Sequence, residues 1–196
     1  MLRTSPGRYQ SGVSLIEVLV TTVVLSLGVL GVAGLGAFAK RSTFEAVQRS
    51  VASEMGYALL EEMRMNKAAL GTYVAAAALG GGTLGAEPAP DCDAPNANCN
   101  ASELATHSLW LWERMIDSGM ESNAGVESGG LLSPSACIAG PAGGATGVYT
   151  VTVVWRGVTE IADSGLTNCG NAKGLYGAGN AFRRVVIVQS YIDPTV

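Results

Sequence analysis

A stretch of 22 residues without a charged side chain, Val18–Ala39, constrains this chain of 196 residues more than any other feature. Glu17 precedes the stretch, and Lys40 and Arg41 follow it. A helix of about 20 apolar residues spans the hydrocarbon core of a bilayer, so the stretch predicts a transmembrane helix. Basic residues flank it in nearly equal number on both sides. The charge rule therefore does not decide which end faces the cytoplasm.

Removal as a secretory signal is one fate of this segment. Arg3 and Arg8 form a basic start, and Ala37–Ala39 offers the small residues of a cleavage site. Cleavage there would release a soluble secreted binding protein that begins at Lys40. Signal cores have about 7–15 apolar residues, and this longer stretch therefore favours a retained helix.

The string Gly-Val-Ser-Leu-Ile-Glu-Val-Leu-Val at 12–20 resembles the processing site of the type IV prepilins. In that family a short basic leader ends in glycine, a prepilin peptidase cuts after it, and the new terminal residue is N-methylated. The resemblance implies a cut between Gly12 and Val13, although the family usually has phenylalanine at the new terminus. Three further segments are similar to the minor pilins called PilV, or type IV pilus modification proteins: Leu27–Leu35, Tyr149–Gly157 and Arg183–Val188.

Glu17 is the acid that this family carries at the start of its apolar helix. A carboxylate among apolar neighbours is costly unless it is protonated or meets a cation. The resemblance implies that Glu17 attracts the terminal amine of Val13 in a neighbouring subunit. Ser14-x-x-Glu17 is also a capping box, which holds free amides at a helix start. The two roles are compatible, and the match of the whole string favours the assembly role.

Beyond Arg41, apolar residues recur at steps of three or four, which predicts that the helix continues to about Asn66 with one apolar stripe. Gly56 interrupts a stripe that consists of Phe44, Val47, Val51, Met55, Leu59 and Met63.

The rest of the chain predicts an α+β head. Residues 70–100 are rich in Ala, Gly, Pro, Asp and Asn, which predicts a long surface loop with a short helix or strand at 72–79. A helix is expected over 103–117, and β-branched and aromatic residues predict strands over 148–155 and 184–192. This order suits a pilin-like fold, in which an antiparallel sheet packs on the carboxyl half of the long helix.

The four cysteines follow the membrane segment, fall in predicted loops and are even in number. An oxidising compartment would join them, with three possible connectivities. We favour Cys92 with Cys99, which closes a short loop, and Cys137 with Cys169, which ties a long loop to the sheet. Zinc is disfavoured because no Cys-x-x-Cys occurs and His107 is the sole histidine.

No catalytic residue, cofactor or metal site is expected. His107 lies in a predicted helix, and no serine has a nucleophile signature, so a packed or helix-surface histidine is expected. Asp91, Asp93, Asn96 and Asn98 offer oxygen ligands for calcium, but the glycine and distal glutamate of an EF-hand are missing, which favours a solvated loop.

The head has one basic cluster, formed by Lys173, Arg183 and Arg184. The chain as a whole has a net charge of -4 and lacks the basic excess that binding to nucleic acid requires. The cluster is therefore expected to be a screened surface, and nucleic acid is not an expected partner.

The resemblance implies a structural subunit and not an enzyme. Four parts are expected: a leader at 1–12, a transmembrane and assembly helix at 13–39, its amphipathic continuation at 40–66, and a head at 67–196. Such a minor pilin is made in the bacterial inner membrane with its head in the periplasm and then enters a pilus for adhesion, twitching motility or DNA uptake. Its partners would be prepilin peptidase, other major and minor pilins and the inner-membrane assembly machinery, without a small-molecule substrate. A minor pseudopilin of a type II secretion system is the nearest rival, because the same amino-terminal string permits it.

Overall fold

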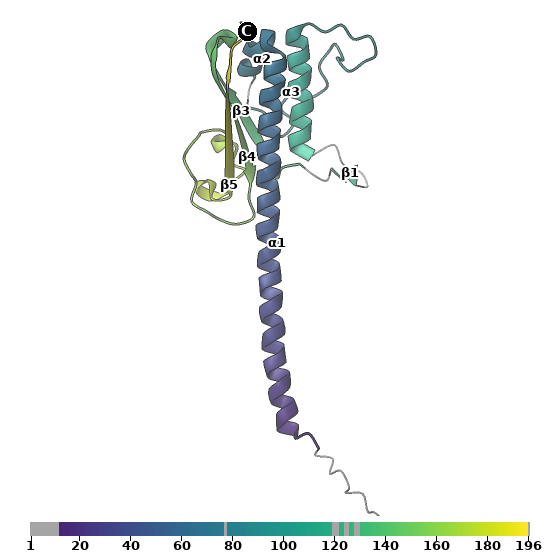
Figure 1. Cartoon of the computed structure of the whole chain (residues 1–196), viewed down its shortest axis with the longest axis vertical. Helices are drawn as coiled ribbons and strands as arrows, with labels where there is room; N and C mark the ends of the chain where they lie inside the picture. Colours follow the sequence, from purple (N-terminus) through teal and green to yellow (C-terminus); the bar gives the residue numbers. More distant parts are fainter. Residues whose placement is uncertain (1–11, 77, 119–121, 124–125, 128–129, 196) are drawn as a thin grey trace, which may run out of the picture. The chain divides into compact units, whose positions relative to one another are not determined.

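A computed structural model describes residues 12–76, 78–118, 122–123, 126–127 and 130–195. The chain divides into two compact units, Met1–Thr43 and Phe44–Val196, and helix α1 (Leu15–Met65) contributes to both. Except for Gly12, the leader expected at 1–12 lies outside the described residues. The predicted α+β, pilin-like class is confirmed, because a long apolar helix is followed by a three-stranded antiparallel sheet (Figure 1).

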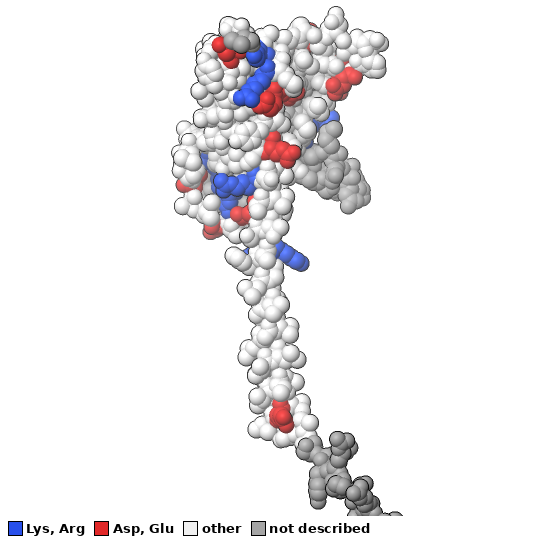
Figure 2. All heavy atoms as spheres, viewed as in Figure 1, with Lys and Arg blue, Asp and Glu red and all other residues white. Residues whose placement is uncertain are grey.

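In the first unit, α1 exposes its apolar side chains. The helix is long and apolar enough to cross a membrane, and Figure 2 shows an uncharged surface along this stretch. Residues 18–39 rise about 33 Å along a helix, close to the roughly 30 Å of a hydrocarbon core. The hydroxyls of Thr21, Thr22 and Ser26 donate to backbone carbonyls three residues earlier, at 2.8–2.9 Å. These polar groups are therefore satisfied without water.

In the second unit, the sheet has the strand order β3-β4-β5. β4 (Gly147–Arg156) and β5 (Arg183–Ile192) pair along their whole length, and β3 (Ser135–Ala139) pairs with the other edge of β4. β4 and β5 match the strands expected at 148–155 and 184–192, and no end differs from the expected one by more than one residue. Such long strands of Val, Ile, Tyr and Trp carry a strong propensity signal.

β3 is absent from the sequence prediction, and it corrects the expectation that all four cysteines lie in loops, because Cys137 is at its centre. Its sequence, Ser-Ala-Cys-Ile-Ala, contains one β-branched residue and therefore gives little strand signal. Backbone pairing on both sides forms the strand. Beyond its ladder with β4, Ala136 exchanges two hydrogen bonds with Leu79, at 2.8 and 2.9 Å.

The carboxyl half of α1 contains all the buried positions of this helix, and two of them are small residues. Its buried positions are Gln48, Ala52, Gly56, Leu59, Leu60 and Met63. Phe44 and Val47 are 43% and 53% exposed, so the predicted stripe is wrong at its start. A Cβ built on Gly56 would lie 2.7 Å from Val188 Cγ2 and 3.7 Å from Val153 Cγ2. The sheet comes so close to this helix that a large side chain does not fit between them.

Helix α3 (Ala101–Ser118) lies on the side of α1 away from the sheet (Figure 1). Trp112, which is 1% exposed, donates its indole N–H to the Met55 carbonyl of α1 at 2.9 Å. The remaining elements are short: α2 (Leu70–Ala75), the strand pair β1 (Ser122–Asn123) and β2 (Val126–Glu127), and 3-10 turns at Lys67–Ala69, Ala142–Gly144, Asn171–Lys173 and Ala178–Asn180. α2 overlaps the short helix or strand expected at 72–79 but begins earlier, at Leu70. Leu70 and Tyr73 are buried, so the surface loop expected from residue 70 is wrong at its start.

Candidate functional site

The peptide bond between Gly12 and Val13 precedes α1, and residues 12–14 have no regular secondary structure. Both residues are exposed, Val13 by 71%. A Cβ at Gly12 would meet no atom within 4 Å among the described residues. Exposed backbone outside secondary structure is where proteases cut most readily. The predicted cleavage position thus lies in exposed backbone outside secondary structure.

Glu17 lies in the first turn of α1, where a carboxylate interacts favourably with the helix dipole. Its backbone N–H and that of Val18 both donate to the Ser14 carbonyl, at 3.0 and 3.2 Å. Within the described part of the chain, the side chains of Ser14 and Glu17 form no hydrogen bond, so the capping box is not formed there. The Glu17 carboxylate is exposed, and it is available to a cation from outside these residues.

Four glycines in the apolar half of α1, Gly28, Gly31, Gly34 and Gly36, have no neighbour within 4 Å of a built Cβ in the described residues. Glycine costs up to about 1 kcal/mol in a helix relative to alanine. No described contact within the chain uses their small size. In membrane helices, small residues allow another helix to approach closely.

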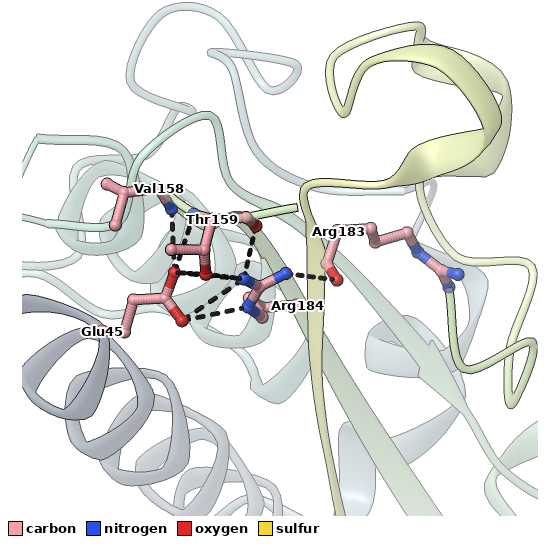
Figure 3. A network of polar contacts seen from close by, with 5 residues as sticks. All are labelled: Glu45, Val158, Thr159, Arg183 and Arg184. Atoms are coloured by element: carbon pink, nitrogen blue, oxygen red, sulfur yellow. Dashed lines mark hydrogen bonds and ion pairs between the residues drawn. The ribbon is translucent and has the colours of Figure 1, made fainter. Parts of the chain in front are cut away.

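Glu45 of α1 binds the end of the sheet and the loop beside it (Figure 3). Its Oε1 accepts hydrogen bonds from the backbone N–H groups of Val158 and Thr159, at 3.1 and 3.0 Å, and from the Thr159 hydroxyl at 2.7 Å. Arg184 of β5 donates to the same oxygen at 3.0 Å and also to the Thr159 carbonyl at 2.7 Å. One carboxylate thus joins α1, β5 and the loop that follows β4.

The pKa of the Glu45 carboxyl lies below its ordinary value. Burial acts to raise this pKa, but the hydrogen bonds from Thr159 and Arg184 and the positive charge of Arg184 outweigh burial. The ionised form is therefore the one that the network stabilises.

The three cations of the predicted basic cluster all have partners inside the head. Arg183 is 2% exposed and donates to both carboxylate oxygens of Asp163, at 2.8 and 2.9 Å. Lys173 donates to the Gly80 carbonyl at 2.8 Å, and Arg184 pairs with Glu45. The expectation of a screened surface is wrong for Arg183, because neighbouring residues on a strand face opposite ways and this one faces inward.

Glu113 of α3 holds the glycine-rich segment before α3 in place. Its carboxylate accepts backbone N–H groups from Gly80, Thr83 and Leu84, at 2.6, 2.9 and 2.7 Å, and also the Thr83 hydroxyl. Burial acts to raise the pKa of Glu113, but these hydrogen bonds outweigh it and the pKa is lowered. One turn along α3, Asp117 binds the N–H groups of Gly81 and Gly82 in the same way, at 2.7 and 2.8 Å.

Gln48 is a buried amide that the sequence analysis missed. Its Nε2 donates to the Gly130 carbonyl at 3.0 Å, and its Oε1 accepts the Leu132 N–H at 3.2 Å. The side chain thereby pairs with the segment before β3 much as a strand would. One feature of the sequence could have indicated its burial. Gln48 lies four residues before Ala52 and eight before Gly56, so it shares a helix face with two small residues.

The cysteines form the two disulfides favoured from the sequence, Cys92–Cys99 and Cys137–Cys169. The first closes the loop that precedes α3. The second joins β3 to the loop between β4 and β5, across 32 positions of sequence. An oxidising compartment is consistent with both.

His107 of α3 is 2% exposed, which agrees with a packed histidine. Its surroundings were not foreseen. Nε2 lies 3.4 Å from Glu87 Oε1, 3.8 Å from Asp91 Oδ1 and 3.9 Å from Asp93 Oδ2. The chain separates these acids from His107 by 14 to 20 positions, so no local spacing reveals the cluster. Among the described residues, this is the group with the side chains to hold a metal ion.

Comparison with known proteins bears on the amino-terminal segment. Residues 7–33 match the family model described as the prokaryotic N-terminal methylation motif. No curated protein and no solved structure matches the chain. The motif includes Gly12, Val13 and Glu17 and ends within the apolar helix α1, and a disulfide-bonded head follows that helix. Together these findings support a type IV pilin-like prepilin, a class that includes pilins and pseudopilins.

Proposed function

We propose that the protein is a minor type IV pilin of the PilV type, a structural subunit that is processed after Gly12 and incorporated into a pilus or primes its assembly. The observation that carries the proposal is the methylation motif at residues 7–33, which ends within an apolar helix. The exposed junction before α1 and the free carboxylate at Glu17 support it. The disulfides of the head agree with folding in the periplasm.

In this proposal, prepilin peptidase removes residues 1–12 and methylates the new amine of Val13. Residues 13–39 remain in the inner membrane as the assembly helix, residues 40–66 continue it, and the head at 67–196 faces the periplasm. On assembly, Glu17 meets the amine of a neighbouring pilin. Two opposite charges about 4 Å apart attract by about 4 kcal/mol at an effective dielectric constant of 20. This attraction offsets the cost of moving the carboxylate among apolar helices.

Processing is tested by intact mass and amino-terminal sequencing of the full chain, expressed with its host's prepilin peptidase. The expected product begins at methylated Val13. Gly12→Val should block the cut, because a branched side chain occupies the position where glycine allows close approach of the backbone. Gly7→Val, the same change within the leader, is the matched control and should be processed. A product in the soluble fraction that begins at Lys40 would contradict the proposal.

Assembly is tested in the native host by comparing wild type with Glu17→Gln, which keeps the shape of the side chain and removes its charge. The variant should be processed normally and yet be depleted from sheared pilus fibres. Normal incorporation would refute the role of Glu17. Recovery of the wild-type subunit in a complex with secretion pseudopilins, and its absence from fibres, would favour the pseudopilin instead.

A further inference from the structure

His107 and three carboxylates form a cluster on the face of α3 that carries the Cys92–Cys99 loop. The histidine comes from the rigid helix and its side chain is 3% exposed, with Nε2 directed at the acids. Asp93 comes from this loop, and Glu87 and Asp91 come from the segment that leads into it; their side chains are 73%, 45% and 53% exposed. A buried nitrogen ligand thus faces oxygen ligands that are free to adjust.

Three carboxylates face one imidazole in this cluster, and each has an oxygen within 4.0 Å of His107 Nε2. Nε2 carries at most one proton, so it can donate one hydrogen bond at a time. The nearest oxygen, at 3.4 Å, is already at the long limit for such a bond. A divalent cation would compensate the acids better than this single contact.

The atoms have the type and spacing of ligands for a transition metal. One ligand atom each from Glu87, Asp91 and His107 lies within 4.8 Å of the others. Around a tetrahedral zinc ion, with bonds of about 2.0–2.2 Å, ligand atoms lie about 3.4 Å apart. A rotation of the exposed acids would close this difference. An imidazole nitrogen favours zinc-class ions over calcium, which prefers oxygen alone.

We propose that Glu87, Asp91 and His107 bind one divalent transition-metal ion of the zinc class, with Asp93 as a further or alternative oxygen ligand. The ion would join the segment that leads into the Cys92–Cys99 loop to α3 and so fix this surface of the head. The described cysteines are all disulfide-bonded, so they do not compete as zinc ligands. The proposal is independent of the pilin function.

The single histidine makes the test specific. The full chain is labelled with ¹⁵N-histidine, purified in detergent without a polyhistidine tag and with its disulfides intact, and titrated with zinc chloride. Zinc should shift the one Nε2 resonance and saturate at one equivalent. The double variant Glu87→Gln/Asp91→Asn should weaken binding by at least about 10–100-fold, the loss seen when even a supporting partner of a metal ligand is removed. Both changed side chains are largely exposed, so the fold should be kept, and thermal melting checks this.

The matched control is Glu54→Gln/Glu160→Gln, which removes the same charge from two exposed positions of the same unit. It should bind zinc like the wild type. An unchanged resonance in excess zinc would overturn the proposal and leave a buried histidine beside three acids. Equal weakening in the two double variants would also overturn it, as would a shift caused by calcium and not by zinc.

Discussion

Because α1 approaches the sheet closely at Gly56, we predict that a larger residue at this position lowers the free energy of unfolding. Gly56→Ala places a methyl carbon where a Cβ lies 2.7 Å from Val188 Cγ2. Val188 is 5% exposed and β-branched, so its side chain has little freedom to move away. Overpacking of this kind costs about 1–3 kcal/mol, and alanine returns up to about 1 kcal/mol of helix propensity. We expect a net loss of about 1–2 kcal/mol in the free energy of unfolding.

Urea unfolding of the oxidised chain in detergent, followed by tryptophan fluorescence, measures this loss, because all three tryptophans lie in the second unit. Gly34→Ala is the matched control in the same helix, where a Cβ meets nothing within 4 Å, and it should leave the transition unchanged. In a Val188→Ala background the clash is removed, so Gly56→Ala should become neutral or stabilising. The resulting coupling should be about 1–3 kcal/mol. Additive effects of the two substitutions would refute the argument that this contact requires glycine.

Three further outcomes follow from the head. Glu113→Gln should lower the free energy of unfolding by about 2–3 kcal/mol at neutral pH, because the buried side chain loses the charge that strengthens its hydrogen bonds to Gly80, Thr83 and Leu84. Since the folded pKa of Glu113 is lowered, its contribution to stability is present above the unfolded pKa and lost as the pH falls through the folded pKa. The difference between variant and wild type should therefore shrink in acid denaturation curves. Asp163→Asn leaves Arg183 buried without its countercharge and should lower the free energy of unfolding by about 3 kcal/mol, measured in urea. A loss under about 0.5 kcal/mol, as at an exposed pair, would show that water solvates the arginine in the variant. Replacing both Cys137 and Cys169 with serine should lower the free energy of unfolding by about 3–4 kcal/mol by the loop-entropy model. The model would be contradicted if this variant lowered the calorimetric melting temperature no more than the variant that lacks the short Cys92–Cys99 disulfide.

The sequence predicted those parts of the fold that repeat a local pattern. The apolar run, the steps of three or four beyond it and the two valine-rich strands each carry a periodic signal, and α1, β4 and β5 follow them closely. β3 carries no such signal, because its strand character comes from its partners. The buried face of α1 differs from the predicted apolar stripe for a related reason. The pattern of large apolar residues does not include Gln48, Ala52 and Gly56, although all three are buried. Gly56 is buried against Val188 of β5, and Gln48 against the segment before β3.

The candidate sites divide in the same way. Gly12, Val13 and Glu17 lie within six positions of one another, so a short motif carries them. Glu45 and Arg184 are 139 positions apart, and His107 is 20 positions from Glu87. Only the closed fold brings these groups together. Their residue types alone also do not predict these contacts, because single acids and a lone histidine on helices are most often solvated or packed.

The glycines of α1 show how differently its two halves are constrained. Gly56 is explained by a neighbour within the chain, Val188 on β5. The glycines between 28 and 36 and the carboxylate of Glu17 are explained by no described contact within the chain, although each is disfavoured in an isolated apolar helix. Under the proposed function, a neighbouring subunit supplies both the helix surface and the amine. The matched motif at residues 7–33 contains Glu17, Gly28 and Gly31, so it includes residues for which the proposed function supplies a partner outside the chain.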